Sequence, residues 1–568
     1  MFIPALIQDC GSSSRTTLLL PGRAIYNTAI TFGPKHCGNT MVENELRVGC
    51  AVESATRNVL LRRMDWRFLT MPQPSRGFGA GDNTMADAVA LVTAIRGDEY
   101  DVAALARPKE HLIADVVRRL NPNGWLYIEW QRFASKAGIC RQLSRYGIDE
   151  VRFYRPWPSL HAAEAWIPLG SPQVSSFFAR RLFPPLTDIV AVLSRPRRWA
   201  SYYSWAFGLR APNVTIGRNT HHRRSADDTA AFVIQNWRSW TQSMPPKRLS
   251  LLLLTGGRRS FNKVVALAFA DNRPRPDIAI KFPRELEAVR ALSREASILR
   301  QVGRRVGNRL GGYPRVLFAA EWNGSFMVAQ TAILGRPVLL LIRPGDYRVA
   351  AEKGTRWLTE FARYSSNGPP SLEWQNVAKA VLDRLETLLK GHAAELLRTV
   401  RAALAAIGPL PQVIEQRDFA PWNLVLDDDG TLGVLDWESA ECSGLPYLDL
   451  IYFLTMLAFQ HAGMPSHKWT AATAAYYIRL SGDQHPMGQT RRALLEEYGR
   501  KLDLDPRSVG PLSMLCWAIH CTSELVNFAR DNEAEPVGTH LERSVFFCLL
   551  NEEVRLYRSG QIASRIEP

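Results

Sequence analysis

Two carboxylates and an amide are spaced along this chain in a way that could carry out a chemical reaction. Asp418 and Asn423 lie five positions apart in residues 416–423 (QRDFAPWN). Asp436 follows them after an apolar stretch. Transfer of a phosphoryl group from a magnesium nucleotide needs little covalent chemistry from a protein: one carboxylate orients the acceptor hydroxyl, and an amide and a second carboxylate hold the metal. These three polar groups would suffice for such a transfer.

A short hairpin is expected to bring two of these groups together. Residues 423–426 and 432–435 have the apolar character of strands, and residues 427–430 (DDDG) that of a tight turn between them. The hairpin would place Asn423 and Asp436 at the same end of the ribbon. Magnesium prefers a few hard oxygen ligands together with phosphate oxygens, so one magnesium site could use both residues. The alternative is that the acidic residues of the hairpin are only solvated turn carboxylates.

This segment resembles the catalytic core of the aminoglycoside phosphotransferase family, which shares its fold with protein kinases. The loop of that family usually reads H-G-D-x-x-x-x-N, and its metal motif reads D-x-[DE]. The resemblance implies that Asp418 is the catalytic base and that Asn423 and Asp436 hold magnesium. Asp449 also matches a family position, one that supports the catalytic loop.

Two residues of the loop depart from the family pattern. Gln416 stands where His is usual, and Arg417 stands where Gly is usual. The triplet at 416–418 is therefore closer to the H-R-D of protein kinases than to the usual form of the family that the segment resembles. In these folds the usual His is mainly structural, so its replacement leaves the chemistry in place.

The residues before this core carry the features of a nucleotide-binding lobe in the expected order. Residues 249–254 form a mostly apolar run that leads to Gly256 and Gly257, and residues 263–269 follow as a second strand. Because glycine permits close approach of the backbone, the N–H groups of such a turn can bind phosphates. A Gly-Gly turn alone is more often only a hairpin.

The next strand and helix supply a charged pair. Lys281 lies in the strand expected at 277–284, and Glu295 lies in the helical segment expected at 285–302. A pair between these residues would resemble the kinase ion pair that holds the phosphates of the nucleotide.

The last strand of the small lobe is expected at 325–331, and residues 334–337 (LGRP) resemble the hinge of the family, where backbone groups contact the nucleotide base. The donor is expected to be ATP, with GTP as the alternative, bound together with Mg²⁺. The residues predicted to bind this cofactor are Gly256, Gly257, Lys281, Glu295 and Gln330.

The first two hundred residues alternate strand and helix, as in a parallel α/β sheet. Residues 120–129 (LNPNGWLYIE) resemble the L-x-P-G-G-x-L-x-x-E segment of class I S-adenosylmethionine-dependent methyltransferases, and the resemblance extends over 98–170. Cofactor binding would require an apolar strand that opens into a glycine turn, whereas MPQP at 71–74 precedes the glycines of 77–82 (GFGAGD). We expect a truncated domain for scaffolding or acceptor recognition that does not bind S-adenosylmethionine.

The length of the chain also indicates several structural units. At 568 residues the chain is too long for one core, and about 100 to 200 residues per domain corresponds to about three units. We expect a truncated methyltransferase-like α/β domain with a partial Rossmann-like sheet at 1–195 and a linker at 196–225. An α+β two-lobed protein-kinase-like domain would follow, with its N-lobe at 226–335 and a mostly helical C-lobe at 336–568.

The composition limits the binding partners and the cellular compartment that we expect for the protein. The net charge is +16, but the arginines are scattered and no nucleic-acid module accompanies them. A nucleotide and an acidic substrate would explain a basic cleft, as would solvated arginines without a special role. The eight cysteines show no C-x-x-C spacing, and no apolar stretch reaches about 18 residues. We expect a reduced, cytoplasmic protein without a zinc site, a transmembrane segment or a specific nucleic-acid partner.

The sequence does not identify the phosphoryl acceptor. His520, Glu524 and Asn527 share one face of an expected helix, either as acceptor-binding groups or as a satisfied core network. We predict a phosphotransferase that acts on a hydroxyl of a small molecule, a sugar or a glycan. One rival is a pseudokinase that only binds nucleotide, although a binding module would not need all of the polar groups of the site. Another is a methyltransferase whose kinase-like half presents the acceptor, although the expected cofactor strand is absent.

Overall fold

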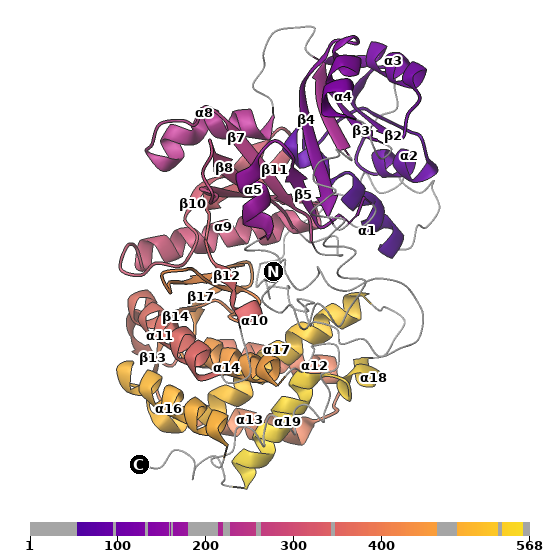
Figure 1. Ribbon diagram of the computed structural model, residues 1–568. Helices are drawn as coiled ribbons and strands as arrows, with labels where there is room; N and C mark the ends of the chain where they lie inside the picture. The colour runs from indigo at the N-terminus through magenta and orange to yellow at the C-terminus, as the bar shows by residue number, and fades with distance from the viewer. Residues whose placement is uncertain are drawn as a thin grey trace.

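The computed structural model describes residues 54–94, 98–130, 135–157, 159–160, 163–179, 214–219, 228–256, 263–341, 347–462, 485–531 and 537–559. These residues form an upper part built on a large sheet and a lower part made mainly of helices (Figure 1). The mixed α and β content that the sequence predicts is therefore present.

One continuous sheet of eleven strands runs through the upper part. The strands are β1 (Gly77–Ala80), β2 (Tyr100–Ala106), β3 (Leu120–Glu129), β4 (Ile148–Trp157), β5 (Ala165–Pro168), β6 (Val214–Asn219), β7 (Leu249–Leu254), β8 (Lys263–Ala270), β9 (Ile278–Pro283), β10 (Val316–Trp322) and β11 (Ser325–Thr331). Their order across the sheet is β1-β2-β3-β6-β4-β5-β7-β8-β9-β11-β10. Antiparallel pairing of β5 with β7 joins the N-terminal strands to those of the predicted nucleotide-binding lobe.

The segment predicted as a linker contains one of these strands. Residues 196–225 were expected to connect two domains, but β6 lies between β3 and β4 and pairs antiparallel with both. Every residue of β6 is buried, including Arg218 and Asn219. Because polar residues at the end of a short strand obscure the apolar signal of a strand, the sequence pattern did not reveal it.

The glycines at 77–82 form a strand and a turn. In the residues described before them, 54–76, there is no buried strand, and Gly77–Ala80 themselves form β1, which pairs parallel with β2. Gly81 has a φ of +106°, and a Cβ there would lie 1.9 Å from the carbonyl oxygen of Ala106. A side chain is therefore excluded at this turn. Asp82 then begins helix α2 (Asn83–Ala90) by accepting a hydrogen bond from the N–H of Met85.

The sheet encloses a hydrophobic core that extends across both halves of the upper part. The short 3₁₀ helix η2 (Asp65–Leu69) is completely buried in it. Trp66 stacks on Tyr127 of β3 at 4.8 Å between ring centroids, and Phe68 packs on Phe282 of β9 at 5.2 Å. An N-terminal segment thus packs on strands from both predicted units.

The small lobe has the order of elements expected from the sequence. Strands β7, β8 and β9 pair antiparallel, helix α9 (Glu287–Arg305) follows, and β11 returns beside β9. Helix α8 (Thr229–Thr241) precedes β7 and begins at Asp228, whose carboxylate accepts a hydrogen bond from the N–H of Ala231. Such a cap satisfies one of the free N–H groups at a helix start.

The lower part is connected to the sheet through the predicted hinge. Arg336 and Pro337 form the short strand β12, which pairs with Leu426 and Val425 of β15 (Leu424–Leu426). Gly335 before it has a φ of +143°, and a Cβ there would lie 2.8 Å from the carbonyl carbon of Leu426. Glycine therefore allows the hinge to run against the hairpin.

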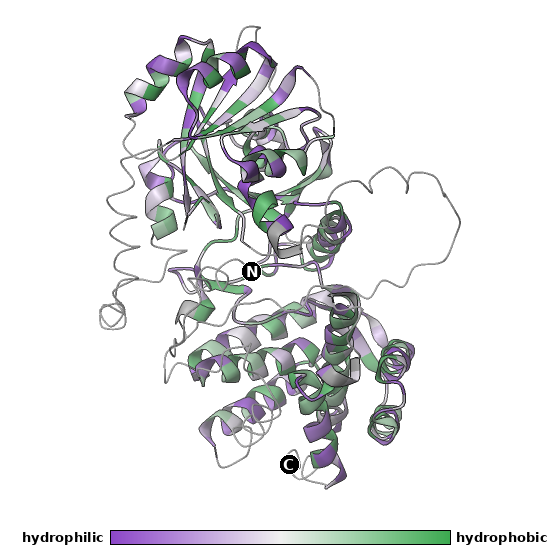
Figure 2. Ribbon diagram, turned by 90° about the vertical axis from the view of Figure 1, so that its right-hand side faces the viewer, coloured by the Kyte–Doolittle hydropathy of each residue, from purple (hydrophilic) through white to green (hydrophobic). Residues whose placement is uncertain are grey.

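Helices form most of the lower part, and they show hydrophobic and hydrophilic segments in Figure 2, as expected of helices with one face on a core. Their bounds are α10 (Val338–Leu341), α11 (Tyr347–Ser365), α12 (Trp374–Leu389), α13 (Ala394–Ala405), α14 (Leu448–His461), α16 (Pro486–Lys501), α17 (Val509–Asp531), α18 (Val537–Leu541) and α19 (Val545–Arg558). Residues 463–484 of the predicted helical C-lobe lie outside the described residues. Among the helices described, none combines the length and the apolar character that a membrane span requires.

Candidate active site

The predicted hairpin carries two of the candidate site residues. Strand β15 pairs antiparallel with β16 (Leu432–Val434). The N–H of Leu435 donates to the carbonyl oxygen of Asn423 at 2.8 Å, which places Asp436 beside Asn423 at the end of the ribbon. The two side chains are almost inaccessible, at 0% and 4% exposure. They are therefore not the solvated carboxylates and amides of an open turn.

The loop from β14 (Leu410–Glu415) to β15 brings Asp418 to the same place. The Asn423 Nδ2 atom donates to Asp418 Oδ2 at 2.7 Å and to the Asp418 carbonyl oxygen at 3.0 Å. The hydroxyl of Tyr452, a residue of α14, lies 3.4 Å from Asp418 Oδ1. The three predicted polar groups of the hairpin and loop thus lie in one buried cluster.

Gln416 connects this loop to the segment that carries Asp436. Its Nε2 atom donates to the carbonyl oxygens of Leu435 at 3.1 Å and Asp436 at 2.5 Å. Its Oε1 atom accepts a hydrogen bond from the N–H of Asp418 at 2.8 Å. Because an amide offers both a donor and an acceptor, Gln416 joins the two segments where His is usual in the family.

Asp449 holds the backbone of this loop by hydrogen bonds. Its two oxygens accept hydrogen bonds from the backbone N–H groups of Gln416 at 2.6 Å and Arg417 at 2.8 Å. Burial raises the pKa of Asp449 to about 6, although the same hydrogen bonds oppose the shift. Arg417 itself has a φ of 64°, a backbone conformation that favours the glycine usual in the family.

The predicted pair between the strand lysine and the helix glutamate is formed. Lys281 of β9 contacts Glu295 Oε1 of α9, and the side-chain exposures are 9% and 0%. Gln330 of β11 is also buried, and within the described part of the chain its Oε1 atom has no hydrogen-bond partner. Because Val328 pairs with Lys281, Gln330 lies two residues along the strand and faces the same side of the sheet. Of the expected phosphate turn, Gly256 follows β7, and Gly257 lies outside the described residues.

Lys263 is a buried residue of the site that the sequence prediction missed. Its Nζ atom lies 2.7 Å from Asp436 Oδ1 and 3.3 Å from Glu295 Oε2, and it also contacts Glu438. The sequence shows only a lysine at the start of the strand expected at 263–269, and the pairing in the structure gives its direction. Val265 pairs with Lys281, so Lys263, two positions earlier in β8, projects from the same face of the sheet.

The donor set fits a magnesium ion. Asn423 Oδ1 and Asp436 Oδ2 are buried atoms that have no hydrogen-bond partner among the described residues. One oxygen each from Glu295, Asp436 and Glu438 lies within 4.8 Å of the others. Since buried polar atoms are normally satisfied and Mg²⁺ takes hard oxygen ligands, an ion held by Asn423 and Asp436 would supply the missing partner.

The surroundings of the site shift the pKa values of Asp418 and Asp436 in opposite directions. Burial, and then the charge of Asp436, raise the pKa of Asp418 well above its usual value. For Asp436 the cations Lys263 and Lys281 outweigh the effect of burial and lower the pKa. Asp436 is therefore held as a carboxylate, whereas Asp418 has a raised affinity for a proton.

The candidate acceptor groups on α17 are packed in the interior. His520 is 8% exposed and stacks on Tyr452, with 4.0 Å between ring centroids and 9° between planes. Burial lowers the pKa of His520 to about 3. Glu524 accepts hydrogen bonds from Ser544 and His540, and Asn527 is 5% exposed. This environment fits the core network, the second of the two readings of the sequence.

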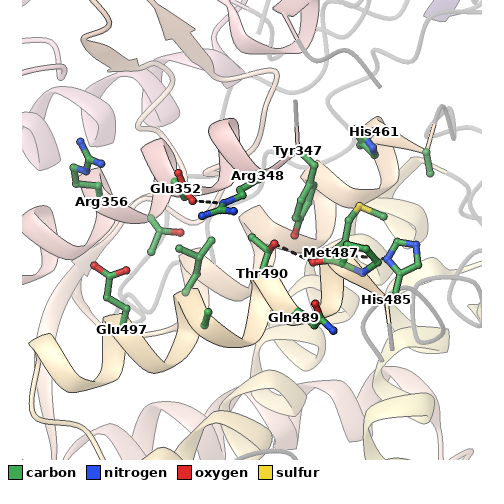
Figure 3. Close-up of a pocket in the computed structure, with 15 residues that line it drawn as sticks. Tyr347, Arg348, Glu352, Arg356, His461, His485, Met487, Gln489, Thr490 and Glu497 are labelled. Atoms are coloured by element: carbon green, nitrogen blue, oxygen red, sulfur yellow. Dashed lines mark hydrogen bonds and ion pairs between the residues drawn. The ribbon is translucent and has the colours of Figure 1, made fainter. Parts of the chain in front are cut away.

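A separate cavity of about 970 Å³ lies between α11 and α16. Figure 3 shows side chains of Tyr347, Arg348 and Glu352 on one wall and Gln489 and Thr490 on the other. None of its lining residues belongs to the catalytic loop, to the hairpin or to the Lys281 pair. We therefore locate the candidate active site by the convergence of side chains and not by this cavity.

A family match accords with this geometry. Residues 271–485 match the phosphotransferase enzyme family. The match contains Lys281, Glu295, Asp418, Asn423 and Asp436 and leaves out the N-terminal strands. The methyltransferase-like character of residues 1–195 consequently stays a prediction. No curated protein matches the chain significantly.

Three solved structures illustrate what the chain is similar to. A proposed aminoglycoside phosphotransferase from Ralstonia eutropha JMP134 is 13% identical over 56% of this chain and 96% of that chain, with a TM-score of 0.38. Aminoglycoside phosphotransferase APH(4)-Ia is 12% identical over 54% and 94%, with a TM-score of 0.35. APH(2")-IIa in a ternary complex with streptomycin and ATP is 10% identical over 57% and 99%, with a TM-score of 0.32. Identities this low do not transfer the ligands of these enzymes to this chain.

Proposed function

We propose that this protein is a phosphotransferase that moves the γ-phosphoryl group of ATP or GTP to a hydroxyl of a small molecule or sugar. The observation that carries the proposal is the convergence of Asp418, Asn423 and Asp436 with the Lys281–Glu295 pair in one buried cluster. These groups come from four different places in the chain: the loop at 416–423, the segment after β16, strand β9 and helix α9. Phosphoryl transfer needs such a set of positioned charges and little else.

Each residue would have a defined role in the transfer. Lys281, held by Glu295, would bind phosphate oxygens of the nucleotide. Asn423 and Asp436 would hold Mg²⁺, which neutralises charge on the phosphates when it is bound. Asp418 would accept the proton of the acceptor hydroxyl. At the same time the hydroxyl oxygen would bond to the γ-phosphorus, and the bond between the γ-phosphorus and the nucleoside diphosphate would break.

The rival of a pseudokinase rests on the two departures in the loop. Gln416 makes hydrogen bonds to Asp418, Leu435 and Asp436, so its presence does not disconnect the loop from the metal ligands. A protein that only bound nucleotide would have no need of a buried Asp418 beside Asn423. These observations favour an active enzyme.

For the N-terminal region we propose a truncated methyltransferase-like sheet with a structural role. In open α/β sheets, ligands bind outside the carboxyl ends of parallel strands. Arg63 of α1 (Ser54–Arg63) fills that place here: its side chain is 3% exposed and bonds Asp82 at 2.9 Å and Glu129 at 2.7 Å. A guanidinium held by both carboxylates supports the expectation that S-adenosylmethionine does not bind.

Calorimetry and a transfer assay test this function. The full chain should bind Mg-ATP or Mg-GTP and should not bind S-adenosylmethionine. With a panel of hydroxylated acceptors, such as sugars, antibiotics and glycan termini, the wild type should form nucleoside diphosphate and a phosphorylated product. Asp418→Asn should retain nucleotide binding and lose transfer. Binding of neither nucleotide would refute the proposal, and binding without transfer to any acceptor would favour the pseudokinase.

A further inference from the structure

Lys263 is a buried lysine that the mechanism proposed above does not use. Its side chain is 1% exposed, and its Nζ atom lies 2.7 Å from Asp436 Oδ1 and 3.3 Å from Glu295 Oε2. Glu438 is a third partner. Burying an ammonium is costly unless opposite charges and hydrogen bonds surround it, so these carboxylates explain why Lys263 can be buried here.

The same carboxylates form the set that could hold a metal ion. One oxygen each of Glu295, Asp436 and Glu438 lies within 4.8 Å of the others, and hard oxygens are the ligands that Mg²⁺ and Mn²⁺ prefer. An ammonium and a divalent cation compete for these oxygens. Two positive charges among the same oxygens repel each other, and a divalent ion repels an ammonium more strongly than a monovalent ion does.

We infer that Lys263 is a built-in counter-ion of the metal site. In the nucleotide-free protein its ammonium takes the position of a divalent cation among the three carboxylates, and binding of the metal–nucleotide complex displaces it toward the phosphates. The second half of this inference rests on the proposed function. The first half concerns the carboxylates alone.

The sheet geometry gives the displaced lysine a nearby destination. Lys263 and Lys281 project from the same face of adjacent strands, because Val265 pairs with Lys281. Phosphates bound by Lys281 would therefore lie within the region that Lys263 can reach. Metal and nucleotide then bind cooperatively. The metal replaces Lys263 at the carboxylates, and the phosphates of the nucleotide provide new anionic partners for the displaced ammonium.

Titration with Mn²⁺ alone tests the first half. Binding to the full chain without nucleotide would be followed by the paramagnetic resonance signal of free Mn²⁺. Lys263→Met should bind Mn²⁺ about tenfold more tightly than wild type, which corresponds to about 1.4 kcal/mol. Lys263→Arg keeps the charge and should bind as weakly as wild type. An unchanged or weakened affinity in Lys263→Met would overturn the inference.

Two further variants keep the test decisive. Lys281→Met removes the neighbouring cation, which contacts only Glu295 of the three carboxylates, and should raise Mn²⁺ affinity less than Lys263→Met does. If Lys263→Met does not fold, as judged by its circular dichroism, Lys263→Gln carries the same test, because its neutral amide can still donate to Asp436. Equal gains at both lysines would mean that Lys263 has no special position and would contradict the inference.

A second titration with ADP separates this inference from the proposed function. In wild type, ADP should raise the affinity for Mn²⁺. The ratio of the Mn²⁺ affinities with and without ADP should be smaller in Lys263→Met than in wild type. An unchanged ratio in that variant would refute the displacement. If ADP does not bind to wild type at all, the proposed function fails, and the comparison without nucleotide still decides whether Lys263 is the counter-ion.

Discussion

Gln416 donates a hydrogen bond of 2.5 Å from Nε2 to the carbonyl oxygen of Asp436, and so ties the catalytic loop to the segment that carries a candidate metal ligand. The same side chain accepts from the N–H of Asp418. The residue that departs from the family pattern therefore makes the connection on which the geometry of the site depends. A glutamine can do so because its amide presents a donor and an acceptor in one plane.

Removal of this amide should disorganise the site. Gln416→Ala leaves the carbonyl oxygens of Leu435 and Asp436 buried without their donor, which should cost about 2 kcal/mol of unfolding free energy. Transfer activity should fall more than nucleotide affinity. Gln416→His, which keeps one donor and one acceptor, should lose less on both measures. Denaturant unfolding and steady-state kinetics would check this, and an alanine variant equal to wild type would show that the connection is dispensable.

The other departure in the loop predicts a difference in stability between glycine and alanine at position 417. Arg417 has a φ of 64°, which a residue with a Cβ adopts at a cost of about 1 kcal/mol or more. Arg417→Gly should have a free energy of unfolding about 1 kcal/mol higher than Arg417→Ala, because both variants lose the contact with Glu415 and only glycine relieves the backbone. Arg417→Ala is the matched control, because it removes the same side chain and keeps the Cβ. If both variants change stability equally in thermal unfolding, the side chain and not the backbone decides the effect.

Much of the site could be predicted from the sequence because its residues lie at fixed places in regular elements. Asn423 and Asp436 flank a hairpin, and Lys281 and Glu295 lie in a strand and the helix that follows it, so local patterns fix their relative positions. Lys263 escaped notice because its contacts come from cross-strand neighbours and from the distant residue Asp436, 173 positions away.

The assembly of the upper part could not be read in the same way. Local periodicity identifies a strand but not its partner, so the pairing of β5 with β7 was not expected. The burial of the 3₁₀ helix η2 could not be predicted either, because its residues include Asp65 and Arg67 as well as aromatics. Charged residues inside a core are recognisable only when their partners are known.

The ion pair of Asp65 with Arg284 should be essential as a pair. Both side chains are 0% exposed, with 2.8 Å between Asp65 Oδ2 and Arg284 Nη2. Arg284 also donates to the carbonyl oxygen of Thr255 at 2.7 Å, directly before the predicted phosphate turn. Asp65→Asn leaves the buried guanidinium of Arg284 without its carboxylate partner and should destabilise the protein by about 3 kcal/mol. Nucleotide affinity should fall as well, because the turn loses its support.

A double-mutant cycle would separate pairing from burial. Asp65→Leu combined with Arg284→Met should cost less than Asp65→Asn alone, because the guanidinium of Arg284 is then removed together with its partner. Arg67, which also lies 3.8 Å from Asp65, keeps its hydrogen bonds to backbone carbonyl oxygens in both variants. Asp115→Asn, in an exposed pair with Arg118, is the control and should change stability by less than about 0.5 kcal/mol. Additive effects of the changes at 65 and 284 in urea unfolding would contradict an energetic link between the two residues.

Glu415 should make the protein less stable as the pH rises. Burial, together with the charge of Asp449, raises the pKa of Glu415 to about 7 from its usual 4.5, although Arg417 opposes the shift. The folded state therefore binds a proton that the unfolded state has released between these values. The stabilising contribution is complete below pH 4.5 and is lost as the pH rises to about 7.

The variant Glu415→Gln isolates this contribution, because its side chain is neutral at every pH. Urea unfolding at pH 5 and pH 8 should show a smaller loss of stability in the variant than in wild type, with a difference on the order of 3 kcal/mol. Glu373→Gln, at an exposed glutamate, should follow wild type. Parallel losses in wild type and Glu415→Gln would mean that Glu415 is ionised in the folded protein at pH 5, which would contradict the raised pKa.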